Sequence, residues 1–253
     1  MKKLSTDFIV LSILLFFMIF NFTSCVKTPS SKYVASTSWV ASFAQMAGIE
    51  NVETIAPANL RHPPEYEITA DDILKVTDCE IFMYAGYERM MKTIANASEI
   101  DQNKIIKVKT TNTVHNISEM VNMLSQKAGT QKSAQKNLDE YIKYIEETRV
   151  QIKALGIDKK SFYVNVNQAE FAADLGINIA GTFGPSPLTS AQLEEIALNK
   201  YDYIIDNIHN PVAEPAKEVS AESKIIMWRN FPDKMEDNAL FNIIKNNCEM
   251  LLK

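Results

Sequence analysis

Residues 132–155 read KSAQKNLDEYIKYIEETRVQIKAL, which is the longest helical pattern in the chain. The stretch contains no Gly or Pro, and its polar positions mix Lys, Glu and Gln. Its apolar residues fall close to helical spacing at Leu138, Tyr141, Ile142, Ile145, Val150 and Ile152. Gly156 follows, as glycine commonly does just past a helix end. We therefore predict one long helix at 132–155.

Strand and helix patterns alternate on both sides of this helix. Strands are predicted at Tyr33–Ser36, Val52–Ala56, Glu80–Tyr84, Lys104–Val108, Ser161–Val166, Ile177–Phe183, Tyr201–Asp206 and Lys224–Trp228. Parallel strands need crossover helices, and the alternation supplies them. The predicted fold class is α/β, with two similar-sized lobes of mainly parallel sheet, 33–131 and 156–253, joined by one long rigid helix.

Helix starts are also marked in the sequence. Thr69 with Asp72, and Thr189 with Gln192, have the spacing of capping boxes. The helix after Lys104–Val108 is expected to begin at Asn116 or Ser118, which leaves His115 in a loop.

The N-terminal segment resembles a lipoprotein signal. Lys2 and Lys3 precede an apolar run that ends in small residues before Cys25. We interpret 1–24 as a signal peptide, Cys25 as the lipidated residue and 25–32 as a tether, with an uncleaved anchor as the alternative. The apolar run is shorter than the ~20 residues that a spanning helix needs. The protein is therefore expected to be exported and held at the outer face of a bacterial membrane by its lipid.

Composition narrows the function. The chain has 26 basic and 31 acidic residues and a net charge of −5, with no basic run, which argues against nucleic acid as a partner. It has no Gly-x-Ser-x-Gly elbow, phosphate loop or Gly-rich dinucleotide turn, which argues against an enzyme. Cys79 and Cys248 are expected to be isolated buried thiols, with a disulfide between them as the alternative.

The chain's three histidines each follow a predicted strand, as His62, His115 and His209. Asp233 follows a fourth strand. Ligands gather at the carboxyl ends of strands in open α/β sheets, and imidazole is the commonest protein ligand for transition metals. The first two residues belong to one lobe and the last two to the other, so a metal between the lobes would bridge them. Such a shell suits zinc.

These segments resemble the metal-binding lipoproteins that supply zinc or manganese to ABC importers. His62 with Tyr66-Glu67 is similar to the first ligand motif, and His115 before an amphipathic helix is similar to the second. Residues 231–235, which carry Asp233, are similar to the segment of the fourth ligand. The resemblance implies two lobes on a rigid helix, metal capture between them and delivery to an ABC permease without catalysis. We also expect a monomer.

The third ligand departs from that pattern. The family has a histidine after the first strand of the second lobe, but residues 165–170 contain none. His209 is the favoured replacement, and Glu170 is the possible substitute, which would suit manganese or iron better. Asp233 has an alternative role as the N-cap of a helix predicted at Met235–Leu252.

Two other functions remain open. The first is a two-lobed binder of an iron-siderophore, haem or corrinoid, which would recruit Arg61, Arg89, Arg229, Trp39 and Trp228. The second is a metal-dependent enzyme or chelatase, which would keep an open coordination position.

Overall fold

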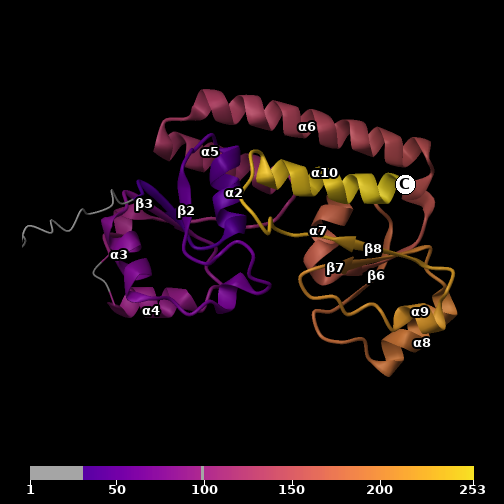
Figure 1. Cartoon of the computed structure of the whole chain (residues 1–253). Helices are drawn as coiled ribbons and strands as arrows, with labels where there is room; N and C mark the ends of the chain where they lie inside the picture. The colour runs from indigo at the N-terminus through magenta and orange to yellow at the C-terminus, as the bar shows by residue number, and fades with distance from the viewer. Residues whose placement is uncertain (1–30, 98–99) are drawn as a thin grey trace, which may run out of the picture. The chain divides into compact units, whose positions relative to one another are not determined.

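Two four-stranded sheets, both parallel, form the centres of the two lobes (Figure 1). The computed structural model describes residues 31–97 and 100–253. The first sheet has the order β2-β1-β3-β4, with β1 at Tyr33–Ala35, β2 at Val52–Thr54, β3 at Ile81–Tyr84 and β4 at Ile105–Lys107. The second has the order β6-β5-β7-β8, with β5 at Phe162–Asn165, β6 at Ile179–Phe183, β7 at Tyr203–Asn207 and β8 at Lys224–Trp228.

The strand order is the same in both lobes. In each lobe the second strand lies on one side of the first, and the third and fourth lie on the other side. Each sheet therefore has a switch point beside its first strand, where the loops at the carboxyl ends diverge and leave room for a ligand. The predicted α/β class, with a parallel sheet in each of two lobes, is confirmed.

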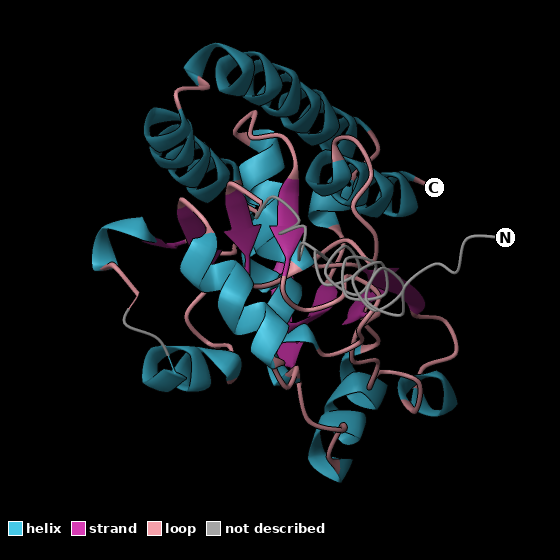
Figure 2. Ribbon diagram, turned by 60° about the vertical axis from the view of Figure 1, so that its left-hand side comes forward, coloured by secondary structure: helices cyan, strands magenta, loops and turns pink. Residues whose placement is uncertain are grey.

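Helices cover both faces of each sheet (Figures 1 and 2). The helices around the shared core are α2 at Ser38–Met46, α5 at Val114–Ala128, α6 at Gln131–Ala154, α7 at Val166–Asp174 and α10 at Ala239–Leu252. The outer faces carry α3 at Ala70–Asp78, α4 at Met90–Ala97, α8 at Ser190–Asn199 and α9 at Ala216–Val219. Short 3-10 turns lie at η1 (Pro63–Glu65), η2 (Gln102–Lys104) and η3 (Ile157–Lys159).

Helix α6 confirms the long helix that the sequence predicts. It spans the two lobes, and Gly156 just beyond it takes a φ of 67°, which glycine adopts without strain. One apolar residue was wrongly assigned to the buried stripe, because Val150 is 66% exposed. Thr148 is buried in its place, and its hydroxyl donates to the Tyr144 carbonyl at 2.8 Å.

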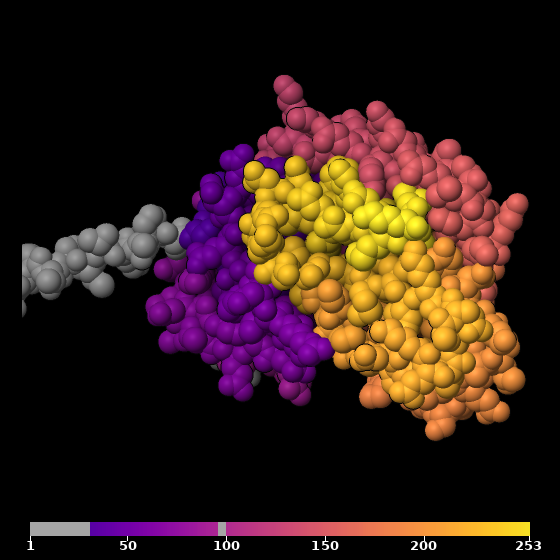
Figure 3. All heavy atoms as spheres, turned by 45° about the vertical axis from the view of Figure 1, so that its right-hand side comes forward, coloured from indigo at the N-terminus to yellow at the C-terminus, as the bar shows by residue number. Residues whose placement is uncertain are grey.

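The lobes share more than this one helix. Helix α10 follows the second lobe's last strand and packs on α2 of the first lobe, and Figure 3 shows the yellow C-terminal segment directly against the indigo one. Ser38 Oγ donates to the Pro232 carbonyl at 2.7 Å. The Gln45 side chain donates from Nε2 to the Glu236 carbonyl and accepts the Ala239 backbone N–H at Oε1. One apolar core runs through both lobes and this joint.

Most of the predicted helix starts are confirmed, with two corrections. The capping boxes at Thr69 and Thr189 both form. Helix α5 begins at Val114 behind the cap Thr113, so His115 lies in its first turn and not in a loop. The residues expected to cap it are inside the helix.

The last helix differs in the same way. It begins at Ala239 after Asn238, so Asp233 lies well before it and does not cap it.

The predicted lipoprotein features lie in the N-terminal segment. The predicted signal 1–24, Cys25 and most of the tether lie outside the described residues. Among the described helices, none is long and apolar enough to cross a membrane. Cys79 and Cys248 are both buried and free, which confirms the prediction of isolated thiols.

Candidate functional site

A cavity of about 620 Å³ lies between the lobes at the carboxyl ends of their strands. Each of the eight strands, or the segment just after it, contributes to its wall. The lining of the cavity includes Trp39, Arg61, His62, Lys107, Lys109, Asn112, Glu170, His209, Asn230 and Phe231. The structure therefore has a cavity at the carboxyl ends of the strands, where the sequence predicts a ligand site.

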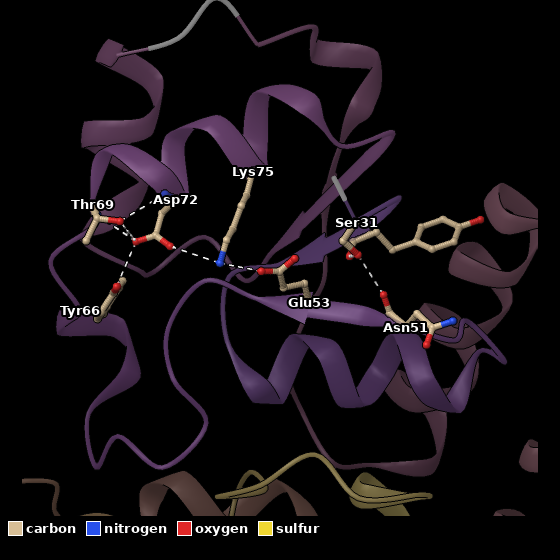
Figure 4. Close-up of polar contacts among 8 residues, drawn as sticks. Ser31, Asn51, Glu53, Tyr66, Thr69, Asp72 and Lys75 are labelled. Carbon is tan, nitrogen blue, oxygen red and sulfur yellow. Dashed lines mark hydrogen bonds and ion pairs between the residues drawn. The ribbon is translucent and has the colours of Figure 1, made fainter. Parts of the chain in front are cut away.

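His62 lines the cavity from the loop between β2 and α3. The loop is fixed at the far end of η1, where the Tyr66 hydroxyl donates to Asp72 Oδ2 at 3.0 Å (Figure 4). That carboxylate also accepts the Thr69 backbone N–H at 2.9 Å, as part of the capping box of α3. The imidazole itself is exposed. The sequence thus anchors the base of the loop and leaves His62 facing the cavity.

His209 lines the opposite wall, in the loop after β7. Asp206, at the end of that strand, is 1% exposed and accepts the Val212 and Ala213 backbone N–H groups, both at 2.7 Å. This closes the loop that carries the histidine. The His209 ring stacks on Phe231 with centroids 3.6 Å apart, and it is only 9% exposed.

The environment of His209 keeps its imidazole neutral. Burial, followed by the positive charge of Arg229, lowers its pKa from 6.5 to about 4. A hydrogen bond to the Phe231 backbone opposes this shift. Nε2 is buried without a hydrogen-bond partner among the described residues. Metal-binding histidines use this arrangement, with one ring nitrogen held by the backbone and the other carrying the lone pair.

Of the other predicted ligands, His115 and Asp233 lie outside the lining of the cavity, and Glu170 belongs to it. His115 is exposed on α5 and Asp233 is 55% exposed in an ion pair with Arg229 at 3.0 Å, and neither lines the cavity. Glu170, the predicted substitute, does line it. Within residues 31–97 and 100–253, no three His, Cys, Asp or Glu side chains come close enough to hold one metal. The structure brings His62 and His209 to one cavity but does not assemble the predicted set of four.

Amide side chains join the lobes inside the cavity. Trp39 Nε1 donates to Asn112 Oδ1 at 3.1 Å, and Asn112 Nδ2 donates to the Asn230 carbonyl at 2.8 Å. Within the second lobe, Gln168 Nε2 donates to Asn230 Oδ1. Arg61 adds a link at the rim, because its Nε donates to the His209 carbonyl at 3.1 Å. The Asn112–Asn230 and Arg61–His209 bonds run between the lobes and fix the spacing of the two walls.

Sequence reasoning missed two cations on the first-lobe wall. Lys107 and Lys109 line the cavity from the end of β4. A signal existed in the pattern Lys107-Val108-Lys109, because alternate residues of a strand point to the same side. Arg61 and Trp39, named for a chelate binder, do line the cavity, but Trp228 is fully buried in the core.

The fold of this chain is similar to the folds of several solved proteins. The laminin-binding protein Lmb of Streptococcus agalactiae, described as a bifunctional adhesin with metal-transporting activity, matches with a TM-score of 0.70, 14% identity and coverage of 88% of this chain and 98% of that one. The solute-binding protein FpvC of Pseudomonas aeruginosa, solved with Ni²⁺, matches with a TM-score of 0.67, 14% identity and coverage of 88% and 96%. This chain shares their fold.

A third match extends the set. The Cd-bound periplasmic metal-binding protein of Candidatus Liberibacter asiaticus gives a TM-score of 0.63, 14% identity and coverage of 87% and 97%. No protein-family model matches the chain, and no curated protein matches it significantly. The similar structures are described as binding or transporting proteins and not as enzymes.

Proposed function

We propose that this chain is an extracytoplasmic solute-binding protein that captures a divalent transition metal for an ABC importer. The observation that carries the proposal is the pair of imidazoles, His62 and His209, on opposite walls of one cavity between two lobes. The fold supports it, because the similar structures include proteins solved with Ni²⁺, Mn²⁺ and Cd²⁺.

The chemistry follows from the state of the imidazoles. A metal needs a nitrogen lone pair, and His209 offers one at neutral pH because its pKa of about 4 keeps the ring unprotonated. Its Nε2 has no partner in the described chain, and an unpaired buried polar atom costs about 1–3 kcal/mol. Coordination would remove this penalty. Nitrogen donors favour zinc or nickel, whereas a contribution from Glu170 would favour manganese or iron.

Capture would not require the lobes to open widely. The continuous core, helix α10 on α2 and the bonds from Asn112 to Asn230 and from Arg61 to His209 all oppose a hinge motion. Loading and release would then depend on local movement at the rim, where His62 is exposed. Paired structures of the metal-free and metal-loaded protein test this, and a large rotation between the lobes would contradict it.

The resemblance to metal-binding lipoproteins supports the partner, and the N-terminal sequence supports the location. We place the protein outside the cytoplasm, attached through a lipid on Cys25, with an ABC permease as the recipient of the metal. Mass measurement of the mature N-terminus tests the anchor, because a free or uncleaved N-terminus would contradict lipidation.

The decisive experiment is metal titration of the chain produced without a histidine tag. Removal of one of two imidazole ligands should weaken Zn²⁺ or Ni²⁺ binding at least tenfold in His62→Ala and in His209→Ala. His115→Ala is the matched control, because His115 lies outside the cavity. Equal affinities for all four proteins would refute the proposed function.

A further inference from the structure

The cavity carries a charge opposite to that of the whole chain. The protein has a net charge of −5, but the wall of the cavity holds three permanent cations, Arg61, Lys107 and Lys109, against one carboxylate, Glu170. None of the three cations forms an ion pair within the part of the chain that the structure describes. Like charges disfavour a bare divalent cation, so the wall selects for a ligand with negative charge.

The protein also offers too few donors for a bare ion. A transition metal takes four or more ligands, whereas fewer than three metal-ligating side chains gather at any point of the described chain. The cavity of about 620 Å³ is far larger than one ion requires, and it falls in the range of small-molecule sites. A single cargo would have to supply the metal ligands that the protein lacks and also fill the remaining volume of the cavity.

We infer that the metal enters this cavity as a complex with a small anionic chelator, coordinated by His62 and His209 and held through its carboxylates by Arg61, Lys107 and Lys109. The inference rests on the proposed function and names the form of its cargo. The chelator supplies the donors that the protein lacks, and its negative charge offsets the cations. Carboxylates are the natural partners of guanidinium and ammonium groups, since charged hydrogen bonds are among the strongest in proteins.

Local structure directs one of these cations. Gly86 has a φ of +99°, and a Cβ at that position would come within 2.5 Å of Lys107 Cε. The lysine chain therefore crosses directly over the glycine. The Gly86 N–H in turn donates to Glu88 Oε2 at 2.6 Å, which fixes the turn beneath the lysine. The backbone is shaped to let Lys107 reach the cavity.

The test uses three probes on the tag-free chain: Ni²⁺ alone, nitrilotriacetate alone, and their complex. The complex is negatively charged and leaves coordination positions open for imidazoles. We expect the complex to bind more tightly than either component. Lys107→Gln and Lys109→Gln should each weaken the complex roughly tenfold by loss of a charged hydrogen bond. Neither should weaken Ni²⁺ alone, because removal of a positive charge favours a cation.

One control variant and the pattern of affinities separate the possible failures. Lys132→Gln, on the exposed face of α6, removes the same charge away from the cavity and should leave all affinities unchanged. If Ni²⁺ alone binds more tightly than the complex, or if the lysine variants bind the complex like the wild type, the chelate inference is wrong and the proposed function stands. If neither Ni²⁺ nor its complex binds, or if nitrilotriacetate alone binds as tightly as the complex, both are wrong.

Discussion

The buried His209 should make the metal-free protein sensitive to acid. In the unfolded chain its pKa is near 6.5, whereas in the folded protein it is about 4. Above pH 6.5 the imidazole is neutral in both states. As the pH falls from 6.5 to 4, the His209 imidazole becomes protonated in the unfolded chain but stays mostly neutral in the folded protein. The free energy of unfolding therefore decreases across that interval. This lowering of the His209 pKa corresponds to at most about 3 kcal/mol of unfolding free energy.

The measurement is urea unfolding at a series of pH values, followed by tryptophan fluorescence, after the metal has been removed. His209→Phe is the comparison, because it keeps an aromatic ring over Phe231 and removes the titration. Carboxylates titrate in both proteins, so the difference between the two pH profiles isolates His209. We expect the wild type to lose about 3 kcal/mol more than the variant between pH 7 and pH 4. A constant difference between the profiles would show that His209 is not held neutral by the fold.

Three further outcomes are expected. Tyr66→Phe should lower the free energy of unfolding by about 1 kcal/mol, because it loses the bond to Asp72, whereas Tyr84→Phe, whose hydroxyl makes no hydrogen bond among the described residues, should change it little in the same urea assay. Asp174→Asn should lower the free energy of unfolding by about 1–2 kcal/mol, because this carboxylate accepts the first N–H of α5 from the other lobe and pairs with an arginine of α6. A melting temperature equal to that of the wild type would argue against this link between the lobes. Ligand binding should change the fluorescence of Trp39, which lines the cavity, and Trp39→Phe should abolish the change; a signal that persists in the variant would place the ligand elsewhere.

The fold was predictable because its signals are local. The helix at Gln131–Ala154 has an uninterrupted 3.6-residue pattern with glycine just beyond it, and β8 lies at Lys224–Trp228 as predicted. The capping boxes at Thr69 and Thr189 depend on residues three positions apart, so no distant contact is needed to recognise them.

The site was less predictable because it depends on contacts that are distant in sequence. Asn116 was one expected cap of α5, but its amide turns back to the Lys109 and Thr111 carbonyls, and Thr113 caps the helix instead. That change moved His115 onto an exposed helix turn. Asp233 is predicted as a ligand, and the structure shows it in an ion pair with Arg229, four residues earlier, and outside the lining of the cavity.

The packing of α10 on α2 has a consequence for how the protein is made. The apolar face of α2 belongs to the first lobe, yet part of its cover is the helix that a ribosome synthesises after every other element described here. The first lobe therefore cannot complete its packing while the chain is still emerging. We expect the first lobe of a nascent polypeptide to stay loosely folded until α10 has been synthesised, and a loosely folded chain is what a protein threaded through a membrane channel must have.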